Sequence, residues 1–356
     1  MQQTGTIHLP LHYGQAPAWL FNKMAKLARE ISLVLIDEYG TDEYLKRLSN
    51  PNWFQAFGCV LGFDWHSSGL TTTTCGALKE GLKPVEKDLG LFICGGKGRT
   101  SRKTPQELEK TSQKYSFNSQ PLIYASRLTA KVDNNALQDG YQLYHHSFFF
   151  TKEGKWAVVQ QGMNELTHWA RRYHWLSQEV DDFVNEPHTG IATQKRGVVL
   201  NLVHHQSRDN REISTKVSKE KPEKIIKTIK QLQQSKLPKR HEILMADINP
   251  QRLEKIFLST YEKQPENFEK LLGMVGVGPK TIRALSLISE LVYGAPASTQ
   301  DPARYSFAHG GKDGIPYPVD RQTYNQSIEY LKEALNKAKL GYYEKLQAFR
   351  RLANLL

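Results

Sequence analysis

The stretch at residues 271–282, LLGMVGVGPKTI, constrains the fold more than any other, because it specifies two helices joined by a tight turn. Gly276 and Gly278 lack a β-carbon, so they permit positive backbone φ angles and let another group approach the backbone closely. Val277 between them is expected to pack between the two helices. Pro279 suits the first position of a helix, where its missing N–H costs nothing. We therefore expect one helix to end just before this turn and another to begin at Pro279.

The same segment closely resembles the helix-hairpin-helix motif of DNA repair and recombination proteins, over about residues 265–294. A phosphate would approach the backbone at Gly276, and the free amides of Gly278, Lys280 and Thr281 would point at it along the favourable end of the helix dipole. Lys280 adds positive charge. Such contacts hold the sugar-phosphate backbone and read no base sequence. The alternative is an ordinary turn between packed helices, because glycine and proline mark turns in many folds.

Some base-excision glycosylases share this motif, with a lysine inside it and an aspartate downstream. Lys280 falls on that lysine, and Asp320 in the segment PVDR resembles the aspartate. The intervening stretch is longer than in those enzymes, and the cysteines of their iron–sulfur cluster are absent. An alternative role for Asp320 is to cap the helix that follows.

The charge balance favours a polyanionic partner. The chain has 48 lysines and arginines against 36 acidic residues, a net charge of +12, and nucleic acid is the first candidate for such a protein. Residues 216–240 alone hold eight lysines and one arginine against two glutamates, which indicates either a solvated helix face or a stripe facing nucleic acid. No apolar run approaches the roughly 18 residues of a spanning helix, so we expect a cytoplasmic protein without a membrane partner. Three cysteines are too few for a four-cysteine metal site.

The periodicity of apolar residues divides the chain into two predicted domains. Residues 1–210 are expected to form an α/β or α+β domain, and residues 211–356 a helical domain that contains the hairpin motif. In the first domain, the clearest signal is a β-hairpin with strands over residues 141–150 and 155–161. A helix is expected near residues 171–172.

Six further segments carry a resemblance over about residues 5–321. They are GFDWHSSG (62–69), ALKE (77–80), SRKTP (101–105), AKVD (130–133), QDGY (138–141) and VQQGMN (159–164). Together they resemble an uncharacterised prokaryotic family catalogued as domain of unknown function 763. The resemblance implies no activity, although an association with DNA metabolism agrees with the hairpin motif.

Polar residues in the predicted hairpin form a candidate site. Successive strand residues face opposite sides, so His145 and His146 cannot both point into one pocket. A four-residue loop would place His145 opposite Gln160, and a two-residue loop would place His146 opposite Gln161. Either register sets a histidine against a glutamine.

Asp64, His66, Asp139 and either His145 or His146 are the candidate ligands of Mg²⁺ or Mn²⁺. Such an ion would activate water and neutralise charge on a scissile phosphate, with Lys97, Arg102 or Lys131 steadying the transition state. The alternative is that these side chains only build structure, because Asp-Gly is a common turn pair and a histidine in a hairpin is usually hydrogen-bonded.

Two basic clusters are candidate nucleic-acid contacts. The glycine-bearing loop after residue 94 carries Lys97, Arg99, Arg102 and Lys103, which suits either phosphate binding or a solvated surface. Farther on, Arg171 and Arg172 adjoin aromatic residues that either stack on unpaired bases or belong to the core.

The leading hypothesis from sequence is therefore a DNA-processing enzyme, a nuclease dependent on a divalent metal, that grips duplex DNA with the hairpin motif. A non-catalytic DNA-binding or scaffold protein is the second hypothesis. A glycosylase or lyase is the third.

Overall fold

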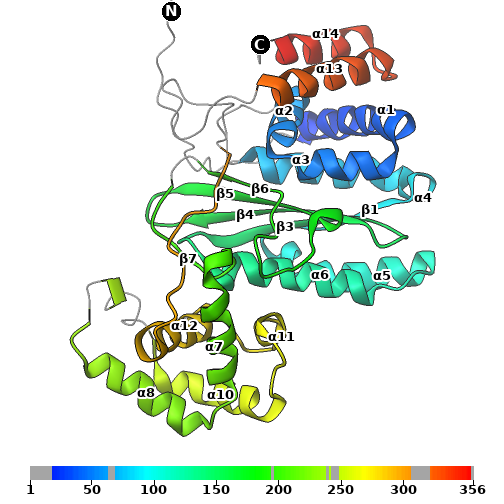
Figure 1. The fold of residues 1–356 in the computed structure, drawn as a ribbon. Helices are drawn as coiled ribbons and strands as arrows, with labels where there is room; N and C mark the ends of the chain where they lie inside the picture. Colours follow the sequence, from blue (N-terminus) through cyan, green and yellow to red (C-terminus); the bar gives the residue numbers. More distant parts are fainter. Residues whose placement is uncertain are drawn as a thin grey trace, which may run out of the picture.

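The computed structural model of the chain describes residues 18–62, 69–193, 196–237, 240–241, 248–305 and 321–353. Its centre is a five-stranded antiparallel sheet in the order β1-β3-β4-β5-β6 (Figure 1). A small second sheet pairs β2 with β7. This mixed architecture confirms the predicted combination of helices and strands, in its antiparallel α+β form. The strands are β1 (Leu91–Lys97), β2 (Leu137–Gln138), β3 (Gln142–Thr151), β4 (Trp156–Asn164), β5 (Trp169–Leu176), β6 (Gly190–Thr193) and β7 (Leu200–Asn201).

Strands β3 and β4 form the predicted hairpin, but in neither predicted register. The loop comprises residues 152–154, a length between the two alternatives, and Gly154 takes the positive φ of 89° that three-residue hairpin loops require. As a result, two histidine–glutamine pairs lie opposite each other, His146 with Gln160 and His145 with Gln161.

One face of the sheet is covered by helices from both ends of the chain (Figure 1). The N-terminal helix bends at Gly40, which has a φ of 81°. Phe149 points from the sheet into this layer, and Leu331 and Leu335 close it from the far side. The helices of this layer are α1 (Ala18–Ser49), α2 (Pro51–Leu61), α3 (Gly69–Leu82), α13 (Arg321–Lys337) and α14 (Tyr342–Ala353), with the short α4 (Glu86–Leu89) at its edge.

The opposite face of the sheet packs on α5 and α6, and the remaining helices lie beyond these (Figure 1). Phe148, Leu128 and Leu271 belong to one continuous core that joins the sheet, α6 and α11. The helices on this side are α5 (Thr104–Tyr115), α6 (Gln120–Lys131), α7 (Arg208–Ser218), α8 (Pro222–Gln234), α10 (Pro250–Lys263), α11 (Phe268–Gly273) and α12 (Pro279–Tyr293). The short turns η2 (Gly98–Lys103) and η3 (Val132–Ala136) precede α5 and follow α6.

Two features differ from the sequence prediction. The segment with Arg171 and Arg172 is strand β5 and not a helix, and polar partners from distant segments bind both guanidinium groups inside the protein. Helices α13 and α14 pack on α1 and α2 rather than on α7–α12, so residues 211–356 do not form one continuous layer.

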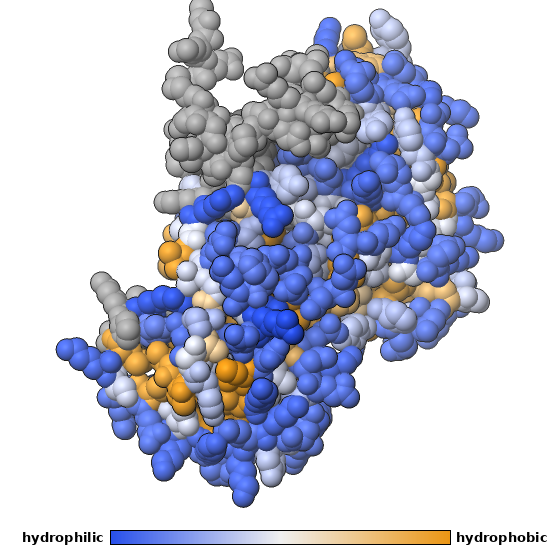
Figure 2. Space-filling model, in the orientation of Figure 1, coloured by the Kyte–Doolittle hydropathy of each residue, from blue (hydrophilic) through white to orange (hydrophobic). Residues whose placement is uncertain are grey.

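Polar residues cover most of the surface drawn in Figure 2, whereas apolar residues gather over the helices at its lower left. Within the described ranges, no helix combines the length and apolar character needed to cross a membrane.

Candidate functional site

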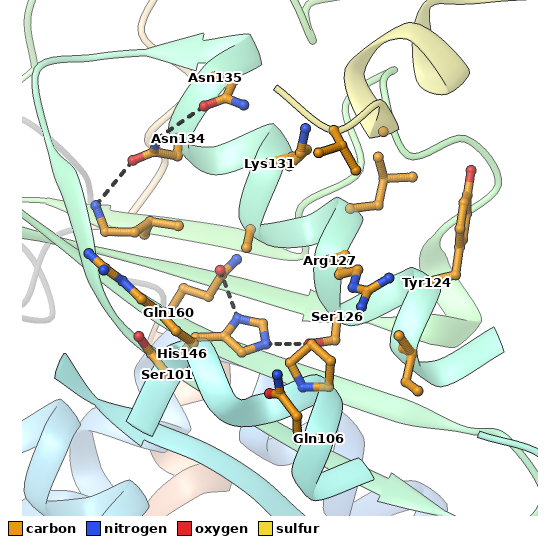
Figure 3. A pocket seen from close by; sticks show the side chains of 18 of the residues that line it. Ser101, Gln106, Tyr124, Ser126, Arg127, Lys131, Asn134, Asn135, His146 and Gln160 are labelled. Atoms are coloured by element: carbon orange, nitrogen blue, oxygen red, sulfur yellow. Dashed lines mark hydrogen bonds between the residues drawn. The ribbon is translucent and has the colours of Figure 1, made fainter. Parts of the chain in front are cut away.

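A pocket with a volume of about 1040 Å³ lies between the sheet, α6 and the turn that joins α11 to α12 (Figure 3). Arg102 reaches it from η2, and Gly276 reaches it from the α11–α12 turn. The predicted basic loop and the predicted hairpin motif, far apart in the sequence, therefore border one cavity. We call this cavity the α6 pocket.

Basic side chains dominate the charge of the α6 pocket. Arg102 and Arg127 line it and are exposed, and Lys131 lines it half-buried. Its described lining holds no aspartate or glutamate. Such a wall suits an anion better than a divalent cation, which prefers carboxylate oxygens. Lys97, Arg99 and Lys103 are exposed on the adjoining β1–η2 segment, outside the lining itself.

Lys131 holds the α11–α12 turn against α6. Its Nζ donates hydrogen bonds to the carbonyl oxygens of Met274 at 2.6 Å and Val277 at 2.9 Å. Burial lowers the pKa of Lys131 to about 8. Gln138 adds a third tether, because its Nε2 donates to the carbonyl oxygen of Pro279 at 2.8 Å. Lys131, which the sequence predicts to act in catalysis, is therefore already engaged in positioning the turn.

The turn has the conformation expected at only one of its two glycines. Gly276 has a φ of 87° and is exposed. Gly278 is extended, with a φ of −122°, and caps α12. Val277 is buried, as predicted. Lys280 is exposed and the Thr281 side chain is buried, but the backbone amides of this first helical turn have no partners within the helix.

A chain of hydrogen bonds leads from the α6 pocket into the core (Figure 3). Ser126 Oγ lies 2.9 Å from His146 Nε2, and His146 Nδ1 lies 2.8 Å from Gln160 Oε1. Gln160 Nε2 donates to Asp133 Oδ2 at 2.6 Å. Trp175 Nε1 donates to the same oxygen at 3.0 Å, and His188 contacts the other oxygen of Asp133. Ser126 and His146 therefore lie at the wall of the pocket, and Gln160 and Asp133 in the core hold His146 in its orientation.

His145 belongs to the opposite side of the hairpin. Its Nε2 lies 3.0 Å from Ser147 Oγ, although the residue also borders the α6 pocket. The two adjacent histidines therefore have separate hydrogen-bond partners, yet both are among the residues that line the α6 pocket, so the prediction that they cannot share one pocket is not confirmed.

Asp139 is not placed to share a metal ion with His146. Its carboxylate accepts from Arg171 Nη1 at 2.9 Å and from the Tyr173 hydroxyl at 2.7 Å, and it is fully buried. The second guanidinium nitrogen of Arg171 donates to Asp301 at 2.7 Å. Burial opposes the charge on Arg171, yet these two carboxylates raise its pKa above the ordinary value. Asp139 thus neutralises a buried cation, and a role as a metal ligand would require it to give up this partner.

Arg171 and Arg172 are also unavailable to nucleic acid, because each is only 1% exposed. Arg172 points to the other face of the sheet, where its guanidinium donates to Gln55 Oε1 at 2.9 Å and to the carbonyl oxygen of Pro51 at 3.0 Å. Both side chains tie the sheet to its covering layers, which corrects the prediction that they contact bases.

Asp64, His66 and Asp320 lie outside the described residues. Among those described, the ligand atoms of Glu186, His204 and His205 approach within 4.8 Å of one another. The Gln206 amide donates to His204 Nδ1 at 3.2 Å, so a neutral His204 carries its proton on Nε2, the nitrogen that faces Glu186. Within the cluster, Glu186 Oε1 lies 3.1 Å from His205 Nδ1, a hydrogen bond, and 3.8 Å from His204 Nε2.

Sequence reasoning missed Ser126 and Arg127, which line the α6 pocket, and Asp133, which ends the hydrogen-bond chain behind it. Ser126 and Arg127 lie in the interior of helix α6, where no spacing in the sequence distinguishes them. The available signal was the expected facing of a histidine and a glutamine, which the structure realises as His146 with Gln160.

A family model described as "Protein of unknown function (DUF763)" matches residues 5–319. No curated protein and no solved structure matches the chain.

Proposed function

We propose that this chain, which belongs to the DUF763 family, binds the sugar-phosphate backbone of nucleic acid, most simply DNA, at the α11–α12 turn and the adjoining α6 pocket. One observation carries this proposal. Arg102 and Arg127 line the same pocket as Gly276, so basic side chains and the exposed backbone of the turn border a single cavity. A phosphate at the turn would thus lie beside cations contributed by another part of the fold.

The lining chemistry supports an anionic occupant. Asn134 and Gln106 add neutral polar groups to the basic wall, and the described lining contributes no carboxylate that would repel a phosphate. The net charge of +12 would draw a polyanion to the surface before it docks.

Binding of labelled duplex and single-stranded DNA at a series of salt concentrations tests the proposal. We expect affinity to fall steeply with salt, and the logarithmic slope to decrease by about one for each of Arg102→Ala and Arg127→Ala. Arg208→Ala removes an equally exposed charge outside the pocket and should leave the slope nearly unchanged. Binding that ignores ionic strength, or an equal effect of all three changes, would refute the assignment.

Hydrolysis of DNA with Mg²⁺ or Mn²⁺ is a second proposal, which rests on the acidic and imidazole residues predicted from sequence. Since Asp139 is paired with Arg171, the remaining candidate ligands of the metal ion are Asp64, His66 and His146. Cleavage assays with each metal and with a chelator, on wild type and Asp64→Asn, test it directly.

A further inference from the structure

The α6 pocket ends at two side chains that can perform chemistry on a bound phosphate. Ser126 projects from α6 and His146 from β3, and Figure 3 shows both pointing toward one another at the pocket wall. Their side-chain atoms lie 2.9 Å apart, within the reach needed for proton transfer. The residues are 3% and 5% exposed, so they lie at the base of the cavity, where little water surrounds them.

The hydrogen-bond chain behind His146 fixes which ring nitrogen carries the proton. The Asp133 carboxylate accepts from Trp175 and from the Gln160 amide nitrogen, and this contact turns the Gln160 oxygen toward His146. An oxygen acceptor at Nδ1 places the proton of a neutral imidazole there. Nε2 then holds a lone pair that accepts the Ser126 hydroxyl proton. The arrangement is that of a nucleophile, its base and a group that orients the base.

The surroundings favour attack on an anion. Arg102 and Arg127 line the same cavity and would offset the charge that grows on a phosphoryl group in the transition state. Exclusion of water strengthens this attraction.

We propose that Ser126 is a nucleophile and His146 its general base in the cleavage of a DNA phosphodiester held at the α6 pocket. This inference rests on the backbone binding proposed above. Ser126 Oγ forms a bond to phosphorus as its proton passes to His146 Nε2, and the bond from phosphorus to the ester oxygen opposite breaks. The departing alkoxide takes a proton from water, and the imidazolium returns its own proton to the hydroxide so formed. The product is a phosphodiester of Ser126. A second water then attacks phosphorus as His146 takes its proton, the bond from phosphorus to Ser126 Oγ breaks, and the imidazolium gives that proton back to Oγ.

The test combines cleavage, trapping and binding on one set of end-labelled single-stranded, nicked and duplex DNA oligonucleotides. The wild-type protein should cleave at least one of them in the presence of a chelator. Acid quenching should leave label attached to the protein, and mass spectrometry should place the modification on Ser126. Ser126→Ala should abolish the adduct, and His146→Gln should lower the cleavage rate by roughly 10²- to 10⁴-fold, with DNA affinity retained in both.

Ser147→Ala is the matched control, because this buried serine also contacts a histidine but does not line the pocket. It should cleave at the wild-type rate. Bound DNA that is never cleaved or trapped in a chelator, or normal cleavage by folded Ser126→Ala, overturns the inference and leaves backbone binding intact. An adduct mapped to another residue overturns it even when a variant fails to fold. Absence of DNA binding removes the proposed function and this inference together.

Discussion

In the protein without a bound anion, three histidines of the central sheet lie where protonation is unfavourable. A phosphate in the α6 pocket would oppose this for His146, because a nearby negative charge favours the imidazolium. Burial lowers the pKa of His145 to about 3 and of His146 to about 4, and it lowers that of His174 well below the ordinary 6.5. Between about pH 6.5 and 4, these histidines therefore bind protons in the unfolded chain but stay neutral in the folded protein. We predict that the free energy of unfolding falls as pH decreases through this window, by up to about 1.4 kcal/mol per pH unit for each histidine. Urea denaturation at a series of pH values measures the slope.

Single substitutions separate the contributions of these histidines. His146→Gln should make the slope shallower, since it removes one titrating group, whereas His168→Asn at an exposed position with positive φ should leave it unchanged. A slope that is the same in wild type and His146→Gln would contradict the assignment of a depressed pKa to His146.

The buried pair of Arg171 and Asp139 gives a second prediction at this scale. Arg171→Ala leaves Asp139 and Asp301 without their shared cation inside the protein, which should cost about 3–5 kcal/mol of unfolding free energy. Arg99→Ala, at an exposed position of the basic loop, is the comparison and should change stability little. Denaturant unfolding monitored by circular dichroism measures the unfolding free energies of the two variants and of the wild type. A stable Arg171→Ala protein that has lost DNA affinity would instead support the role predicted from sequence.

The sequence predicted some of the residues that line the α6 pocket, namely those whose neighbours are set by local strand pairing. Cross-strand pairing, with either of the two loop lengths considered, was enough to predict that a histidine of β3 lies opposite a glutamine of β4, although not which pair. It carried no information on Ser126, whose contact with His146 depends on how α6 docks on the sheet. Arg171 was misassigned for the same reason, since its partners Asp139 and Asp301 come from distant segments.

At the scale of elements, the α11–α12 turn distinguishes two glycines that look equivalent in the sequence. Gly276 has a φ of 87°, whereas Gly278 is extended, and a β-carbon would find room at both positions. We predict that Gly276→Ala lowers the unfolding free energy by about 1–2 kcal/mol through backbone strain. Gly278→Ala should leave stability nearly unchanged. Thermal and urea denaturation of the two variants compare these effects directly.

The same two variants report on the proposed contact with phosphate. If the backbone at Gly278 approaches a phosphate closely, Gly278→Ala should weaken DNA binding although its stability is normal. Equal destabilisation by the two alanines would contradict the conformational difference between these glycines.

Elements with local signals were predicted well, and those that depend on distant partners were not. Pro279 begins α12, as the sequence predicted. Strand β5 was predicted as a helix. Its two arginines interrupt the apolar pattern of a buried strand, and the sequence does not show that they have buried partners. The hairpin of β3 and β4 was recognised, but its register followed the actual loop length.

On the scale of the whole molecule, packing contacts cross the boundary at which the sequence analysis divided the chain. Leu271 and Leu285 of the C-terminal half share a core with Phe148 of the sheet and Leu128 of α6. Helices α13 and α14 return to the N-terminal layer. Amphipathic periodicity predicts that a helix has a partner, but it does not say which one.

Removal of α13 and α14 tests this arrangement. Leu331, Leu335 and Leu352 are at most 1% exposed and belong to the same core as α1 and α2, so a chain cut after Tyr305 would expose apolar surface across that layer. We predict a lower melting temperature and increased binding of a hydrophobic dye, because burial of each such side chain contributes about 1.5–3 kcal/mol.

In the full chain, Leu335→Ala should lower the unfolding free energy by about 2–5 kcal/mol. Tyr343→Ala, at an exposed position of α14, should cost little. DNA affinity of the folded variants should persist, since the α6 pocket lies on the opposite face of the sheet. Unchanged stability of the shortened chain would show that these helices do not close the N-terminal core.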